Sequence, residues 1–200
     1  LPRAVLTGAS LADAVLVETA LPGALLDGVQ AAGAYFIAAD LAGARLSGSD
    51  FTGADFSGGV LNGADFGASD LTNASIEGAV CAQANFAEAD LTKLRASEQT
   101  DFSGSSFGRT WGPESIWGKA NLTGADFSYA RMEGAGFMGA TLKNANLFAA
   151  DLKHARFIKA DLEGARLVQM NLFEGSLERA NLTDADLSGS NLYGVEFHGA

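Results

Sequence analysis

Large apolar residues recur at every fifth position along almost the whole chain. Eighteen such positions lie between Leu6 and Leu91, and fifteen of them hold Leu or Phe. A small residue, most often Ala, lies two positions before each of them, so the two side chains point to the same side of an extended backbone. The phase then moves by one residue, and between Phe102 and Phe197 seventeen of twenty positions hold Leu or Phe.

A period of five matches neither the α-helix, with about 3.6 residues per turn, nor the alternation of a simple strand. It predicts short extended pieces separated by corners, where glycines such as Gly48, Gly53 and Gly58 are frequent. The apolar pairs then converge on a central axis. The pattern therefore predicts a solenoid, with Leu and Phe at its centre and Ala where neighbouring walls come close.

Individual units resemble the repeat of the pentapeptide repeat family. Examples are Ala-Asp-Leu-Ala-Gly at 39–43, Ala-Asp-Phe-Ser-Gly at 54–58, Ala-Asn-Leu-Thr-Gly at 120–124 and Ala-Asp-Leu-Ser-Gly at 185–189. The resemblance covers nearly the whole chain. It implies an all-β fold, a right-handed quadrilateral parallel β-helix with four units per coil. We expect residues 1–200 to form a single β-helix, with columns of residues stacked at intervals of 20.

The repeat is weakest where its phase changes. Gly112 and Trp117 occupy centre positions there, and Pro113 lies between them. Because Trp is bulky for a coil centre and Pro cannot donate a ladder hydrogen bond, we expect a register break or excursion at about 92–118. Two interpretations stay open: a tolerated insertion, or a protruding recognition loop that carries Trp111 and Trp117.

Composition narrows the function. The net charge of −11, from 24 acidic and 13 basic residues, argues against direct binding of nucleic acid. The apolar runs are too short to span a membrane. The chain begins Leu1-Pro2-Arg3, without Met or a signal-peptide pattern, so we expect a segment of a longer protein. We expect a cytoplasmic location, with export through a dedicated secretion system as the alternative.

Catalytic groups are few. Cys81 occupies a centre position and is expected to be a buried small hydrophobe. His154 and His198 lie at outward positions, and no second His lies at ligand spacing to either. We therefore expect no catalytic, cofactor or metal site, and predict that the protein is not an enzyme.

The acidic residues support an alternative function. Residues 1–92 hold 11 acids and 2 bases, whereas 93–200 hold 13 acids and 11 bases. Members of the resembled family bind type II topoisomerases as acidic mimics of DNA. The resemblance thus implies DNA gyrase as an alternative partner, although the near-neutral second half counts against it. The acids expected to serve this function, three of them stacked by the 20-residue period, are Asp50, Asp70 and Asp90, together with Asp55 and Asp65.

Outward apolar residues favour protein contacts instead. The 20-residue period stacks Phe148 with Val168, Phe173 with Tyr193, and Met138 with Ile158, while Val15, Val17, Tyr35 and Ile37 share one face of the first two coils. Contiguous exposed apolar patches mark contact surfaces. The expected partner-binding residues are Phe148, Val168, Phe173, Tyr193, Met138, Ile158, Trp111 and Trp117.

The function predicted from these patterns is a rigid, non-enzymatic scaffold for protein interactions. It would be a module of a larger bacterial protein, such as a secretion-associated one. The expected partner is another protein, an adjacent domain of the same polypeptide, or a second copy bound end to end or side by side.

Overall fold

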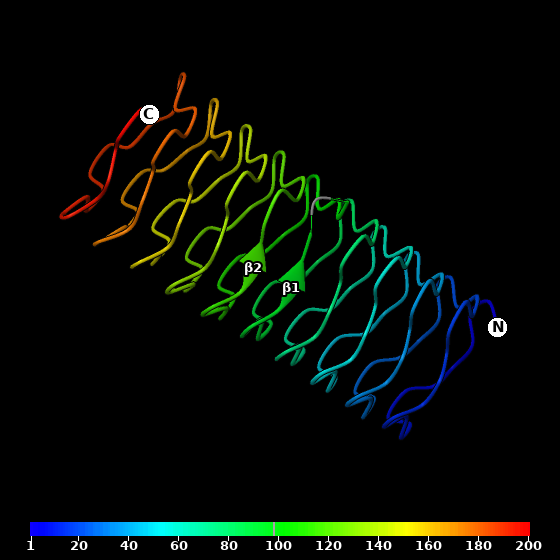
Figure 1. The fold of residues 1–200 in the computed structure, drawn as a ribbon. Helices are drawn as coiled ribbons and strands as arrows, with labels where there is room; N and C mark the ends of the chain where they lie inside the picture. The colour runs from blue at the N-terminus through cyan, green and yellow to red at the C-terminus, as the bar shows by residue number, and fades with distance from the viewer. Residues whose placement is uncertain (98) are drawn as a thin grey trace.

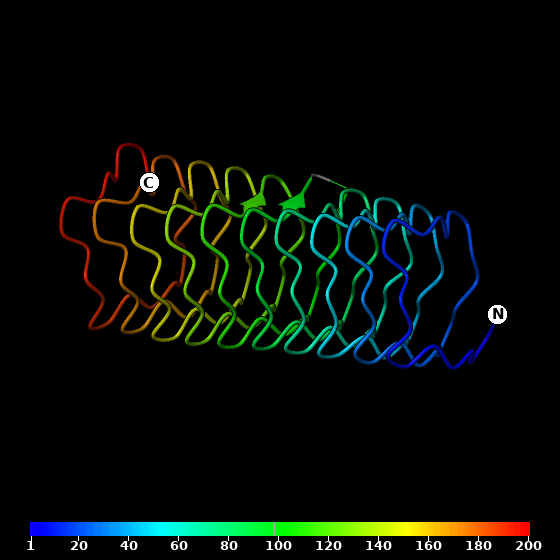
Figure 2. The ribbon, with the colours of Figure 1, turned by 90° about the horizontal axis from the view of Figure 1, so that it is seen from below.

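The chain winds into an elongated, four-sided parallel β-helix in a computed structural model (Figure 1), with the two termini at opposite ends of the rod. The structure describes residues 1–97 and 99–200. Parallel bridges join residues one coil apart, such as Val5 with Leu25. Only β1 (Arg95–Ala96) and β2 (Ile116–Trp117), which pair in parallel, are longer than one bridge among the described residues. The side view in Figure 2 shows how the coils stack along the axis.

Each pentapeptide contributes one bridge residue, so the bridges form four columns, which we call faces. Face 1 runs from Val5 to Asp186, face 2 from Ser10 to Asn191, face 3 from Val15 to Glu196 and face 4 from Ala20 to Asn181. Coils are numbered from the N-terminus, so coil 1 holds the first bridge residue of each of the four columns. A corner is named by the two faces that it joins.

Backbone hydrogen bonds explain why five residues make one unit. The amide of the centre residue donates to the next coil (Leu46 N to Asp65 O, 2.7 Å). So does the amide two positions after it, which belongs to the third corner residue when the centre residue is counted as the first (Gly48 N to Gly67 O, 2.9 Å). The bridge residue donates to the preceding coil, and the small residue closes the corner by donating to the centre carbonyl. Four of the five amides in a unit are thereby paired with backbone oxygens.

An Asp or Asn side chain pairs with the remaining amide. In the unit of Asp50, the Oδ1 atom accepts a hydrogen bond from Thr52 N at 2.9 Å, and Asn85 accepts one from Ala87 N at 3.0 Å. This local Asx bond explains why Asp and Asn recur at the bridge position. Among the described residues, the third corner residue adopts positive φ, which Gly supplies at 18 corners and other residues at 21, so Gly is favoured there without being required.

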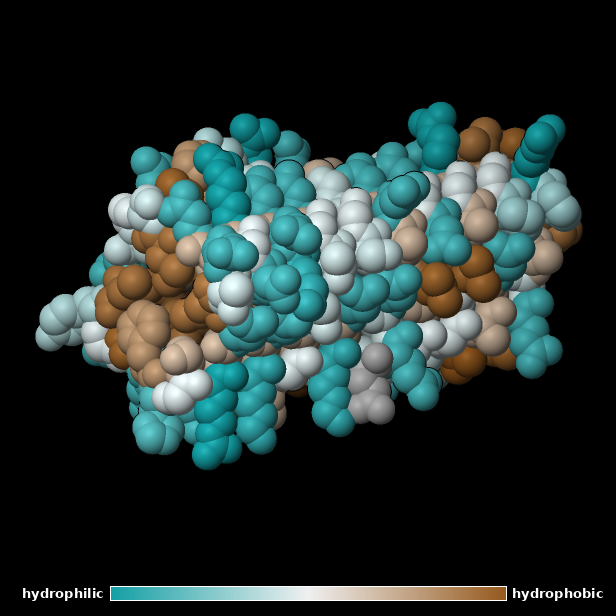
Figure 3. All heavy atoms as spheres, turned by 90° about the horizontal axis from the view of Figure 1, so that it is seen from above, coloured by the Kyte–Doolittle hydropathy of each residue, from teal (hydrophilic) through white to brown (hydrophobic). Residues whose placement is uncertain are grey.

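The core consists of the centre residues, stacked along the axis. Phe36 lies parallel to Phe56 with ring centroids 4.9 Å apart, and Phe107 lies parallel to Phe127 at 4.6 Å. Such pairs are one coil apart, so the ladder spacing itself sets the ring spacing. In the last coil the centre residue Phe197 is 43% exposed, and Figure 3 shows apolar atoms gathered at that end of the rod.

The phase change is one inserted residue at corner 3–4 of coil 5. Thr100 N donates to Ser97 O at 2.9 Å, and the Thr100 hydroxyl accepts hydrogen bonds from Gly78 N and Ser97 N, each at 3.0 Å. Asp101 then bridges Asn121, 20 residues on, as in the other coils. The expected excursion at about 92–118 is thus confined to this corner, of which residue 98 lies outside the described residues.

Trp117 and Pro113 lie in regular coils, which corrects the expectation of a protruding loop that carries Trp117. The Trp117 side chain is fully buried, and its Nε1 donates to Ser115 Oγ at 2.8 Å. The indole packs edge to face on Phe107 and Phe127, with ring centroids 5.1 and 5.8 Å apart. Pro113 occupies a corner position whose amide takes no part in the ladder, while its carbonyl still accepts from Lys93 N at 3.0 Å.

Candidate interaction surfaces

Aromatic residues at outward positions, some exposed and some half-buried, frame the second half of face 2. Trp111, a bridge residue of this face, is 49% exposed. Tyr129 and Phe148 lie on corner 1–2, and Phe173 and Tyr193 lie on corner 2–3. We call these five residues the aromatic frame. They come from coils 6 to 10, where face 2 no longer carries the acidic column of the first half.

Contacts within the frame hold its rings in place. The Arg166 guanidinium lies 4.1 Å from the centroid of Phe148, whose ring meets Tyr129 edge to face at 5.5 Å. Phe173 and Tyr193 are stacked, with centroids 5.4 Å apart and planes 8° from parallel. Tyr193 is 71% exposed. Four of the five rings of the frame, all but Trp111, are therefore held by an aromatic or cationic neighbour.

A small cavity of about 390 Å³ lies on face 3 beside His154, and another of about 350 Å³ lies within the frame. The second is lined by Arg109, Thr110, Trp111, Tyr129 and Arg131, with the Arg109 guanidinium 5.8 Å from the Tyr129 centroid. The sequence patterns single out Trp111 but miss Tyr129 and both arginines. The available signal was an aromatic residue at the positive-φ corner position, where Gly is commonest.

The other expected contact residues divide between surfaces. Val168 continues the column of Phe148 and is half-buried, as are Phe148 and Phe173. Met138, 52% exposed, lies on corner 3–4 with Ile158 in the next coil, away from face 2. Trp117 belongs to the core, and its side chain does not reach the protein surface.

The acidic residues are only partly brought together. Asp50, Asp70 and Asp90 are consecutive bridge residues of face 2, whereas Asp55 lies on face 3 and Asp65 on face 1. Each of the three stacked carboxylates accepts the Asx hydrogen bond of its own corner, at 2.8 to 2.9 Å. Their position is thus explained by the fold, which leaves the second carboxylate oxygen for any partner.

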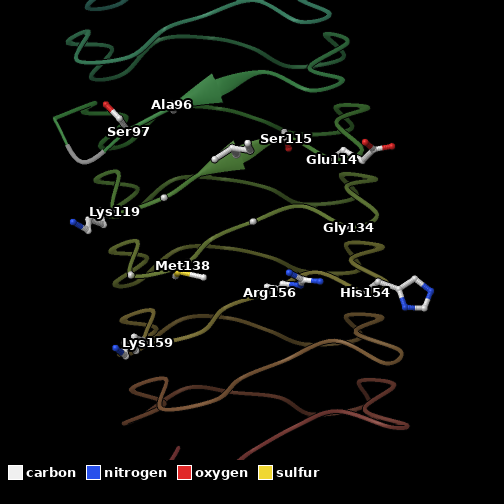
Figure 4. A pocket seen from close by; sticks show the side chains of 14 residues that line it. Ala96, Ser97, Glu114, Ser115, Lys119, Gly134, Met138, His154, Arg156 and Lys159 are labelled. Atoms are coloured by element: carbon white, nitrogen blue, oxygen red, sulfur yellow. The ribbon is translucent and has the colours of Figure 1, made fainter.

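Face 3 carries a groove that the sequence patterns do not reveal. It encloses about 970 Å³, and Ile116, Gly136 and Met138 contribute to its apolar lining. Figure 4 shows Lys119 and Lys159 along one side, Glu114 and His154 along the other, and Arg156 between them. A Cβ atom on Gly136 would meet nothing within 4 Å, and no other bridge residue of the described chain is Gly.

No three His, Cys, Asp or Glu side chains in the part of the chain that the structure describes lie close enough to hold a metal ion. Burial raises the pKa of the Cys81 thiol, and the negative charge of Asp101 raises it further, which keeps this group protonated. Within the same residues, no helix has the length and apolarity needed to cross a membrane.

The stacked coils, the central Leu and Phe and the Asx corners define a pentapeptide-type β-helix. The family model for pentapeptide repeats matches residues 32–67, 67–109, 114–144, 145–169 and 171–200, with 8 copies. The chain therefore belongs to the pentapeptide repeat family, and its fold is the right-handed β-helix of that family, as the sequence predicts. The chain matches none of the curated proteins.

Solved structures similar to this chain are also pentapeptide repeat proteins. HetL, involved in heterocyst differentiation regulation in the cyanobacterium Nostoc sp. strain PCC 7120, is 27% identical, with 97% of this chain and 89% of HetL covered and a TM-score of 0.54. AT2G44920 from the Arabidopsis thaliana thylakoid lumen is 30% identical over 46% of this chain and 63% of its own, with a TM-score of 0.45. Full-length QnrB1, a plasmid-mediated fluoroquinolone resistance protein, is 20% identical over 92% and 91%, with a TM-score of 0.41.

Proposed function

We propose that the protein is a rigid, non-enzymatic scaffold that binds another protein through the aromatic frame of face 2. The observation that carries this proposal is the exposure of Tyr193 (71%), Tyr129 (50%) and Trp111 (49%) on a rod whose core is already filled. Folding does not require these rings to be outside. Tyr, Trp and Arg are the residues that dominate binding energy at protein interfaces.

Rigidity and charge support the same proposal. Arg166 holds Phe148, and stacking holds Phe173 and Tyr193, so these three rings lose little side-chain entropy on binding. Residues 93–200 carry 13 acids and 11 bases, so a partner meets a nearly neutral surface. The two guanidiniums of the 350 Å³ cavity, Arg109 and Arg131, suit a partner that presents a carboxylate beside an apolar group.

The test is affinity capture from a lysate of the source cells, followed by quantitative mass spectrometry. We expect a protein that binds the native rod but is lost when Trp111→Ser and Tyr193→Ser are combined. The matched control combines Val60→Ser and Val80→Ser on face 4, where the two side chains are 38% and 39% exposed. A set of captured proteins that is unchanged in the frame variant would remove the frame from consideration.

A second candidate function is that of an acidic DNA mimic that binds DNA gyrase, favoured by the column of Asp50, Asp70 and Asp90. The column presents one charge per coil, about 4.8 Å, against about 1.7 Å per charge along duplex DNA. A gyrase supercoiling assay with the native protein, and with all three residues changed to Asn, tests it. Asn keeps the Asx hydrogen bond, as Asn85 and Asn121 show, so only charge is removed. Inhibition by both proteins alike, or by neither, would count against mimicry.

A further inference from the structure

Face 3 differs from the other three faces in its bridge residues. Asp or Asn occupies five of ten bridge positions on face 1, six of ten on face 2 and five of nine on face 4, but on face 3 only Asp55 among ten. Each Asp or Asn supplies a hydrogen bond to its own corner. Face 3 forgoes this bond in nearly every coil and carries apolar and charged side chains instead.

The bridge residues of face 3 include two apolar blocks. Coils 1 and 2 carry Val15 and Tyr35, which are 74% and 47% exposed and form the projecting block. Coils 6 and 7 carry Ile116, which is 50% exposed, and Gly136, whose missing side chain leaves room beside it in the 970 Å³ groove. Corner 3–4 adds apolar side chains to both blocks, with Val17 and Ile37 beside the projecting block and Met138 beside the groove.

The charged side chains differ between the two blocks. Lys119, Lys159 and Arg156 line the groove with one acid, Glu114 (Figure 4). The projecting block is flanked by acids instead: Asp13 and Glu18 stand at the two corners of coil 1. Between the blocks, coil 3 carries Asp55, coil 4 Ser75 and coil 5 Arg95, so the column changes sign about its middle.

We propose that face 3 is the interface of an antiparallel, side-by-side dimer of this chain, with its two-fold axis beside Ser75. This axis pairs coil 1 of one copy with coil 7 of the other, coil 2 with coil 6, and coil 3 with coil 5. Val15 then covers Gly136, Tyr35 packs on Ile116, and Asp55 faces Arg95. Each contact occurs twice, as an isologous interface requires.

Corner 3–4 agrees with this arrangement, whereas corner 2–3 places Asp13 of coil 1 opposite Gly134 of coil 7, beside Glu133. The axis lies across the rods, so corner 3–4 of one copy meets corner 3–4 of the other. Val17 then lies against Met138, and Glu18 faces Gly139, between Lys119 and Lys159. Glu77 in coil 4 meets Glu77 of the second copy, and this is the one like-charge contact at the centre.

Other registers are disfavoured by the same residues. Parallel rods in face 3 contact would place Asp55 on Asp55 and Arg95 on Arg95. Moving the antiparallel register by one coil in one direction would place Asp55 on Ile116 and Val15 on Arg156. Moving it in the other direction would place Asp55 on Ser75 and so lose the pairing of Asp55 with Arg95. Seven coils at about 4.8 Å give a contact about 34 Å long and one face wide, which lies at the small end of specific interfaces, so we expect a micromolar dissociation constant.

A charge swap tests the pairing. Sedimentation velocity over a range of concentrations should show a reversible dimer, which Arg95→Asp weakens about tenfold or more and which Asp55→Arg combined with Arg95→Asp restores. The control is Asp50→Arg on face 2, which loses the same kind of Asx bond as Asp55→Arg and should leave dimerisation unchanged. A monomer at all concentrations, or a folded double variant that fails to dimerise, would overturn the proposal.

Cross-linking tests the orientation independently. Glu77→Cys places two thiols beside the two-fold axis, so we expect rapid formation of a disulfide-linked dimer on oxidation. Asn62→Cys, at the equivalent corner position on the opposite side of the rod, is the control, and native Cys81 is fully buried and does not interfere. Equal rates for the two variants would rule out the proposed axis.

Discussion

The packing of the aromatic core yields the sharpest prediction for stability. Phe56 is fully buried and contacts three rings, with centroids of Phe36, Phe51 and Phe66 at 4.9, 5.2 and 5.4 Å. Phe56→Ala removes the ring from a coil whose backbone is fixed above and below by the ladder, so the cavity cannot collapse. We expect the free energy of unfolding to fall by about 3 to 5 kcal/mol.

Urea denaturation measures this effect. With a denaturant slope of about 2.5 kcal/mol/M, the loss corresponds to a midpoint about 1.5 M lower. Far-ultraviolet circular dichroism follows the ladder, and the fluorescence of buried Trp117 follows the core. The control is Val60→Ala, at a 38% exposed bridge position four residues on, which should change the unfolding free energy by less than about 0.5 kcal/mol. Equal midpoints for the two variants would refute the assignment of centre and surface positions.

Three further predictions follow from local geometry. Gly175→Ala should lower the free energy of unfolding, measured by heat or urea, by about 1 to 3 kcal/mol. The reason is that the new Cβ would lie 2.5 Å from Leu172 Cδ1 and 2.8 Å from Ala155 O. The control is Gly136→Ala, whose Cβ enters open space and should leave stability unchanged. Asp90→Ala removes the acceptor of the Thr92 amide and hydroxyl and should cost about 1 kcal/mol, while Asp90→Asn should keep most of it; equal losses would contradict the Asx account. Burial raises the pKa of the Cys81 thiol, so as pH rises this thiol ionises in the unfolded chain before it does in the folded one. The contribution of Cys81 to the free energy of unfolding should therefore be constant below the ordinary pKa of 9.0 and should fall as pH rises above it. In Cys81→Ala this fall should be smaller.

The five-residue period contains most of the information about the fold. It assigns the centre residues, and the 20-residue columns follow once four units make a coil. The period could not foresee how Trp117 is accommodated, because that depends on the hydrogen bond from its Nε1 to Ser115 Oγ and on packing against Phe107 and Phe127. It also predicts a wide excursion where one inserted residue is enough, since the Thr100 hydroxyl accepts two amide hydrogen bonds at the altered corner.

The candidate surfaces were harder to predict than the core. Stacking of Phe173 on Tyr193 follows from the period alone and is present in the structure. The groove does not follow, because hydropathy identifies side chains that are present, whereas the groove depends on Gly136 and Gly118, which contribute none. Tyr129 and Arg166 were missed for a related reason: neither forms an apolar pair, and their importance lies in contact with the Phe148 ring.

The Asx bond provides a physical baseline for locating function on such a rod. A bridge position that holds Asp or Asn stabilises its own corner by about 1 kcal/mol, so these residues need no partner to explain them, and the acidic column of face 2 is of this kind. Face 3 lacks Asp or Asn in nine of its ten coils, although Ser176 Oγ accepts an equivalent hydrogen bond from Glu178 N at 3.3 Å. The side chains found there instead, among them Tyr35, Arg95 and Ile116, add nothing to the corners and are turned to solvent. Outward side chains of this kind are suited to contact with another surface, and for that reason face 3 is a stronger indication of assembly than the more numerous charges of face 2.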